Sequence, residues 1–379
     1  MKIRSSRVYC DEKWIPAVIT IENGKIIRIS RDAEEVADYN YNDARILPGF
    51  IDIHCHGAYG FDTNYADPEG LRKWAAGIPS EGVTSFLATT ITDHTETLKK
   101  ALLNVAAVRK EDYKGARIIG VHLEGPYLSL KYKGAQPPEA IVKPSVEEFR
   151  MFQDCAEGAI KVVTLAPEED TDFKLTSYLR ETGVVPSMGH SDASFDTAVD
   201  AVRHGAMSIT HTYNAMSPLN HRENGLVGTA LGLHDLYSEI ICDTRHCTAN
   251  ALNIFYTCKD KDHAVMVSDA LMCKGYPAGT KFLFGGHEIE IYPDGTAHLT
   301  ESGSLAGSTL KLNEGLRNVI EKAGVEEVKA INSCTINPAR LLKEDDHIGL
   351  IKENYDADLT VLDDSYQVLQ TFCKGIPQL

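Results

Sequence analysis

Eight short apolar runs recur through the middle of this 379-residue chain, with amphipathic stretches between them. They read GFIDIH, TSFLATT, RIIGVHLEG, IKVVTLAPE, VVPSMGH, MSITHTYN, SEIICD and AVMVSD. Near-continuous apolar strands separated by helices are typical of a parallel sheet that is buried on both faces. Eight such units predict a (β/α)8 barrel of the TIM type, which usually needs about 250 residues. We therefore expect an α/β fold in which residues 47–344 form the barrel.

The two ends of the chain follow a different pattern. Residues 1–46 and 345–379 contain short alternating segments and turns, which is typical of antiparallel strands. Asn23-Gly24 lies between two apolar runs and predicts a tight hairpin, because this pair adopts the positive φ angles that such a turn needs. We expect the two ends to pair in space as one small β domain beside the barrel.

Capping residues predict the limits of two helices. Ser194 is suited to cap a helix that begins after it, and Gly205 is suited to end it. In the segment INPARLL, Asn337 predicts the cap of a further helix and Pro338 its first residue.

Composition limits the partners and the compartment. The net charge is −16 and the pI is about 5.3, which argues against nucleic acid or an anionic membrane as a partner. The nine cysteines form an odd set without C-x-x-C pairs, and this indicates reduced thiols. The N-terminus lacks the apolar core of a signal peptide, and no run is long enough to span a membrane. These features predict a cytoplasmic protein.

Metal-ligand side chains stand at the ends of the predicted barrel strands. They are His54, His56, Glu124, His190 and His211, and Asp269 is a further carboxylate at the end of the eighth strand. Active sites in this fold lie at the C-terminal ends of the strands, so these residues should meet at one rim. A single histidine after an apolar run is more often a structural residue, and Asp269 would also suit a helix cap. The constellation as a whole favours a metal site; His122 is interpreted as structural support, and Cys55 is expected to point away from the metal.

The motifs LPGFIDIHCHG, GVHLEGPYLS, MGHSDAS, THTYNAM and VSDA resemble the amidohydrolase superfamily, and within it the N-acetylglucosamine-6-phosphate deacetylase family, over essentially the whole chain. The resemblance implies that Glu124, His190 and His211 bind one divalent ion and that Glu124 bridges to a second ion at His54 and His56. The family's ions are one or two per subunit, with zinc first and iron, manganese, cobalt or nickel as alternatives.

The same resemblance assigns the chemistry. It implies that Asp269 takes a proton from the attacking water and returns it to the leaving amine, as general base and then general acid. His246 would polarise the acyl carbonyl and contact the substrate. A likeness to the family's homodimers implies a second copy of the chain as partner.

Further residues are expected to bind an amino-sugar phosphate. By resemblance these are Ala135, Gln136, Asn214, Ala215, Arg222, Leu305, Ala306 and Gly307. Arg222 is the candidate phosphate clamp, because a guanidinium matches phosphate oxygens in pairs. The chain departs from the family pattern at Gln136, where a histidine is common, and at Thr244 and Arg245. These departures make the reaction class firmer than the identity of the sugar.

Three alternatives to an N-acetylglucosamine 6-phosphate deacetylase stay open. One is a deacetylase for another N-acyl hexosamine phosphate, such as N-acetylgalactosamine 6-phosphate. A second is a cyclic amidase or aminohydrolase, which is disfavoured because cyclic amidases usually carry a lysine at the end of strand four, and here that strand has Lys161 only at its start. The third is a metal-binding protein without activity, for which a carboxylate at Asp269 has no purpose.

Overall fold

The computed structural model describes residues 1–32 and 35–379. Its larger sheet has eight strands in the order β15-β14-β13-β12-β11-β10-β9-β6, and all neighbours in it are parallel. The strands are β6 (Phe50–Cys55), β9 (Val83–Thr90), β10 (Arg117–Glu124), β11 (Ile160–Leu165), β12 (Val185–Met188), β13 (Ser208–Ile209), β14 (Tyr237–Ile241) and β15 (Ala264–Val267). Each overlaps one of the eight apolar runs, so the predicted barrel is confirmed.

The barrel closes just beyond the ends of its first and last strands. The backbone N–H of Asp269 donates to the carbonyl of His54, and that of His56 donates to the carbonyl of Ala270, each at 2.8 Å. Within the barrel wall, the carboxylate of Asp52 accepts a hydrogen bond from the hydroxyl of Ser268 at 2.6 Å. The chain thus closes where the histidine pair and the acid of strand eight lie side by side.

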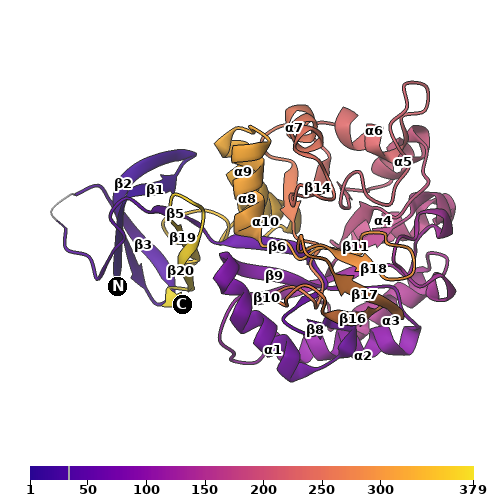
Figure 1. Cartoon of the computed structure of the whole chain (residues 1–379), viewed down its shortest axis with the longest axis horizontal. Helices are drawn as coiled ribbons and strands as arrows, with labels where there is room; N and C mark the ends of the chain where they lie inside the picture. Colours follow the sequence, from indigo (N-terminus) through magenta and orange to yellow (C-terminus); the bar gives the residue numbers. More distant parts are fainter. Residues whose placement is uncertain (33–34) are drawn as a thin grey trace.

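Ten α-helices in the described ranges pack around the barrel or follow its last strand (Figure 1). They are α1 (Pro68–Gly77), α2 (Thr95–Val108), α3 (Val146–Cys155), α4 (Lys174–Glu181), α5 (Phe195–Arg203), α6 (Gly225–Gly232), α7 (Ala249–Cys258), α8 (Leu312–Arg317), α9 (Glu327–Cys334) and α10 (Ile336–Leu342). The Ser194 side chain accepts a hydrogen bond from the Thr197 N–H, which confirms the predicted cap of α5.

The predicted cap of α10 was wrong. The helix begins after Thr335, so Asn337 lies inside its first turn. The Asn337 amide instead donates to the carbonyl of Ala264, the first residue of β15, and to that of Lys261 in the segment before it. Pro338 is still tolerated there, since the first turn of a helix leaves its N–H groups unused.

The second sheet unites the two ends of the chain. Its main path is β21-β20-β19-β5-β1-β2-β3, and β4 pairs with β1. The strands are β1 (Lys2–Cys10), β2 (Lys13–Glu22), β3 (Lys25–Ser30), β4 (Tyr39–Asn40), β5 (Arg45–Pro48), β19 (Leu359–Leu362), β20 (Val368–Cys373) and β21 (Ile376–Pro377). Strand β19 runs antiparallel to β5 and so joins the ends, while Asn23 and Gly24 adopt φ angles of 49° and 76° in the predicted hairpin. The domain limits at residues 46 and 345 stay a prediction.

A small antiparallel sheet follows the last barrel strand. It consists of β16 (Lys281–Phe284), β17 (His287–Ile291) and β18 (Ala297–Leu299). Its side chains Phe284 and Ile289 pack with Ile91 and Met272 in a hydrophobic cluster of their own. Phe284 reaches the His56 ring, with ring centroids 5.6 Å apart, so this sheet supplies part of the wall of the site. No helix in the described ranges is long and apolar enough to cross a bilayer.

Candidate metal and catalytic site

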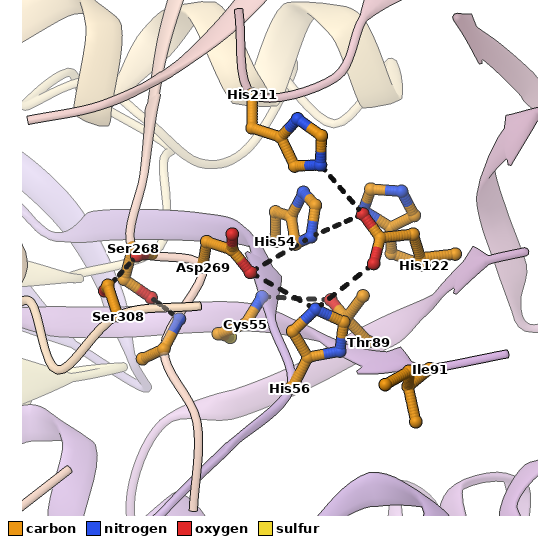
Figure 2. Close-up of polar contacts among 12 residues, drawn as sticks. His54, Cys55, His56, Thr89, Ile91, His122, His211, Ser268, Asp269 and Ser308 are labelled. Atoms are coloured by element: carbon orange, nitrogen blue, oxygen red, sulfur yellow. Dashed lines mark hydrogen bonds and ion pairs between the residues drawn. The ribbon is translucent and has the colours of Figure 1, made fainter. Parts of the chain in front are cut away.

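Figure 2 shows the side chains of His54, His56, His211 and Asp269 gathered in one polar cluster. Glu124, the last residue of β10, stands at the centre of this cluster. Its Oε1 atom lies 3.3 Å from Nε2 of His54, 3.4 Å from Nε2 of His190 and 3.2 Å from Nε2 of His211. Its Oε2 atom lies 3.4 Å from Nε2 of His56. One carboxylate therefore contacts all four histidines predicted to bind metal.

Asp269 completes the cluster from the opposite wall. Its Oδ1 atom lies 3.2 Å from Nε2 of His56 and 3.6 Å from Nε2 of His54. Burial raises the pKa of a carboxyl group, but the charges of His54 and the hydrogen bond to His56 outweigh it and hold the pKa of Asp269 at about 2. Asp269 is therefore a carboxylate at neutral pH, as a proton acceptor must be.

The backbone turns sharply where three of these residues leave their strands. His190, His211 and Asp269 have φ angles of 48°, 30° and 50°, in the left-handed region that side chains other than glycine rarely adopt. Such a conformation costs of order 1–3 kcal/mol per residue and persists only where the surrounding structure enforces it. Strained backbone at three converging polar residues is typical of a functional site.

The donor atoms fit a divalent metal. Nε2 of His54 and Oε1 of Glu124 are buried and find no hydrogen-bond partner within the described ranges. His190 donates from Nδ1 to the Tyr132 carbonyl at 2.9 Å, which leaves Nε2 to coordinate an ion, and this atom lies 3.1 Å from Nε2 of His211. Two ring nitrogens that face one another need a shared cation or proton. Imidazole and carboxylate ligands are those that hold zinc and similar ions.

Two groups of donors are compact enough to bind an ion at this rim. One is Glu124 with His190 and His211; the other is His54, His56 and Asp269, and in each group the ligand atoms lie within 4.8 Å of one another. The first group is the predicted set, and the second joins the predicted pair His54 and His56 to Asp269, which was predicted as the proton acceptor and not as a ligand. Their roles as ligands stay a prediction.

His246 faces the same cavity from the segment after β14. It donates from Nδ1 to Oδ2 of Asp243 at 2.6 Å, which leaves Nε2 for other partners. Burial lowers the pKa of an imidazole, but the hydrogen bond and charge of Asp243 outweigh it and raise the pKa of His246. A histidine held in this way is suited to donate a proton or hydrogen bond.

The cavity above the cluster has a volume of about 330 Å³. Besides the cluster itself, its lining includes the predicted substrate residues Ala135, Gln136, Asn214, Ala215, His246, Leu305, Ala306 and Gly307. Arg222 does not line it. This exposed residue lines a neighbouring hollow of about 760 Å³, which shares Lys131 and Tyr132 with the cavity.

Comparison with known proteins places this site in a family. Residues 45–376 match the model of the amidohydrolase family. The chain belongs to the amidohydrolase family. It is 38% identical to an N-acetylglucosamine-6-phosphate deacetylase of Bacillus subtilis (strain 168), over 94% of this chain and 91% of that one. It is 33% identical to an N-acetylgalactosamine-6-phosphate deacetylase of Escherichia coli O157:H7, over 98% of each.

A solved structure has the same fold over the full length of this amidohydrolase. It is a mutant deacetylase from Mycobacterium smegmatis in complex with N-acetyl-D-glucosamine-6-phosphate, with 26% identity and a TM-score of 0.94 over 100% of this chain and 99% of that one. The expected fold and superfamily are confirmed. Family membership and the donor clusters together support a metal-dependent hydrolase that acts on an amide bond.

Gln136 lines the cavity and also contacts the cluster, whereas His122 is not part of the cavity lining. Gln136, expected to contact substrate, donates to Oε2 of Glu124 at 2.7 Å and accepts from the N–H of Thr92 at 2.8 Å. His122 engages both ring nitrogens, with the carbonyl of Ile53 and the hydroxyl of Thr164, as its structural interpretation predicted.

Glu239, in the middle of β14, was not among the predicted site residues. It is fully buried, and its Oε2 atom lies 2.8 Å from Nδ1 of His54. An acidic residue inside the apolar run SEIICD was the available signal, since a charge is almost never buried in a strand without a partner.

Proposed function

We propose that this amidohydrolase hydrolyses the N-acetyl group of N-acetylglucosamine 6-phosphate and yields glucosamine 6-phosphate and acetate. One observation carries the proposal: Asp269 and His246 face one cavity beside a cluster of metal-ligand side chains. Relatives named for this reaction cover nearly the whole chain.

We propose zinc as the ion, held by Glu124, His190 and His211, with a second place at His54, His56 and Asp269. When bound, a divalent ion lowers the pKa of a coordinated water to about 7 and polarises the carbonyl of the substrate. Glu124 contacts both histidine pairs and is suited to serve both places.

Asp269 and His246 divide the proton transfers. Asp269 takes a proton from the attacking water as the water oxygen bonds to the acyl carbon. His246, oriented by Asp243, donates from Nε2 to the oxygen that gains negative charge. Asp269 then gives its proton to the amide nitrogen as the C–N bond breaks, so acetate and a free amine leave. A carboxylate in this dual role contributes typically 10²–10⁴-fold to the rate.

Arg222 is the proposed phosphate clamp, with the backbone of Asn214 and Ala215 as further donors. The hollow that Arg222 lines shares Lys131 and Tyr132 with the cavity. This supports a substrate that extends from the cavity into the hollow. The relative from Escherichia coli supports N-acetylgalactosamine 6-phosphate as the second candidate substrate. A homodimer and a cytoplasmic location stay predictions.

The test is a panel of N-acetylated hexosamine 6-phosphates, in which released acetate and free amine are both measured. We expect turnover of N-acetylglucosamine 6-phosphate above the galactosamine isomer and the unphosphorylated sugars. Asp269→Asn, which keeps the shape of the side chain, should lower kcat by 10²–10⁴-fold. Faster turnover of unphosphorylated amides, or an unchanged kcat for Asp269→Asn, would refute the proposal.

A further inference from the structure

The most deeply buried acid at the site is Glu239, which no predicted step uses. Its relative exposure is 0%. The backbone N–H of His211 donates to Oε2 of Glu239 at 3.2 Å. Because a backbone N–H only donates, this oxygen is an acceptor, and the ring of His54, whose Nδ1 lies 2.8 Å from the same oxygen, is the second donor.

This contact settles which ring nitrogen of His54 is free. With a proton on Nδ1, the His54 ring can coordinate an ion only through Nε2, and this atom points to Glu124 and Asp269 at 3.3 and 3.6 Å. A carboxylate behind a metal-bound histidine fixes the tautomer and the ring orientation and makes the ligand more basic. Glu239 is such a carboxylate for the side chain of His54, whereas it contacts only the backbone N–H of His211.

The buried carboxylates at the site also favour a second ion. Glu124, Asp269 and Glu239 are 2%, 8% and 0% exposed, and their contacts in the described ranges include four histidines but no lysine or arginine. Buried charges persist where they are paired or coordinate metals. With neutral imidazoles, the three carboxylates carry more negative charge than one divalent ion compensates, and this favours a second ion at His54.

A third compact group, formed by His54, His122 and Glu239, does not offer another metal site. Both ring nitrogens of His122 already have partners, at 3.0 Å to the Ile53 carbonyl and at 2.7 Å to the Thr164 hydroxyl. His122 packs against His54 with ring centroids 4.5 Å apart. It therefore supports the ring that Glu239 orients.

We propose that Glu239 is a positioning residue that aims Nε2 of His54 at a second divalent ion and causes the His54–His56–Asp269 group to retain it. This inference rests on the proposed metal-dependent function. A substitution of Glu239 should weaken ion binding at the His54 group more than at the His211 group. Glu239 bonds to the side chain of His54 but only to the backbone N–H of His211.

The experiment counts ions and measures their affinity, and activity is not its readout. Metal-free protein, prepared with a chelator, is titrated with Zn²⁺ in a calorimeter against a competing chelator, and native mass spectrometry counts the bound ions. We expect two ions per wild-type chain. Glu239→Gln should weaken the second ion by 10–100-fold and leave the affinity for the first within about threefold.

Two further variants separate positioning from general loss of structure. Asp170→Asn also alters a buried carboxylate that accepts backbone N–H groups, but its bonds go to Leu175 and Thr176 of α4, so both ion affinities should stay as in the wild type. His54→Gln should lose the second ion by itself, and adding Glu239→Gln to it should then have no further effect on ion binding.

Three outcomes would overturn the inference. The first is one ion in the wild type, the second is an unchanged second affinity in Glu239→Gln, and the third is equal loss of both affinities. If Glu239→Gln does not fold, the comparison of wild type with His54→Gln still decides whether this group retains an ion. A protein that binds two ions as predicted but hydrolyses no sugar amide would refute the proposed function and leave the inference standing.

Discussion

The buried ion pair of Glu81 and Lys274 offers the sharpest test of what holds the site in place. Their exposed fractions are 0% for both residues, and Nζ of Lys274 lies 2.7 Å from Oε2 of Glu81. The hydroxyl of Tyr59 donates to the other oxygen of Glu81 at 2.6 Å. The pair ties the segment after β15 to the segment before β9. The carbonyl of Lys274 also accepts the N–H of Tyr59, close to the histidine pair of β6.

Lys274→Met removes the cation and keeps most of the volume of the side chain. At 2.7 Å the two charges attract by about 6 kcal/mol with an effective dielectric constant of about 20, and desolvation offsets part of this. Removal of one partner leaves a buried charge without compensation, which costs about 3–5 kcal/mol. We expect a fall of that size in the free energy of unfolding, measured by urea denaturation of the metal-free protein at pH 7.

The double variant Glu81→Gln/Lys274→Met is the control. It removes both charges, so it should recover more than half of the stability that Lys274→Met loses. Lys73→Met breaks an exposed pair with Glu69 and should change stability by less than about 1 kcal/mol. A loss below 1 kcal/mol in Lys274→Met, or a double variant less stable than the single one, would refute the reasoning.

Three more predictions concern the pocket and the charge of the protein. Gln136→Leu leaves the buried N–H of Thr92 without its acceptor, so we expect a loss of about 1–3 kcal/mol in urea unfolding; no loss would contradict the contact. Arg222→Met should lower kcat/KM by about 10–100-fold for the sugar phosphate and not for its unphosphorylated analogue, whereas equal effects on both would remove Arg222 from phosphate binding. Burial lowers the pKa of Lys259 from 10.5 to about 8. The unfolded chain then holds its proton longer, so stability should rise between pH 8 and 10.5 by up to about 3 kcal/mol, and Lys259→Met should flatten this rise in unfolding curves.

Much of the site could be predicted because the barrel topology brings the ends of its strands together. Each ligand candidate stands where an apolar run ends, and parallel strands in one barrel bring all those ends to one rim. Glu124 therefore contacts residues that are far away in sequence, such as His211, which lies 87 positions further along the chain. The same logic located the hairpin at Asn23 and the cap at Ser194, since both depend on neighbouring residues alone.

The features that were not predicted depend on contacts between residues that are distant in sequence. Asn337 was expected to cap its helix, but its amide bonds to two carbonyls more than 70 positions away, and no local pattern reveals such partners. Arg222, whose role as phosphate clamp stays a prediction, lines the hollow beside the cavity, and this position depends on the path of its loop. Gln136 lines the cavity, and its substrate contact stays a prediction; its bond to Glu124 was not predicted.

The order of apolar runs and the residue types at their ends were sufficient to predict the barrel and the rim at which the candidate ligands meet, and the motifs at those ends resembled the family to which the chain belongs. The periodicity of burial and the chemistry of caps and turns are properties of short segments, so they can be read along the chain. Only the tertiary structure decided that Glu239 lies behind His54, that Glu81 meets Lys274, and that one carboxylate oxygen contacts three imidazoles. Those pairings depend on side-chain reach across a packed interior, where neighbours in space are far apart in sequence.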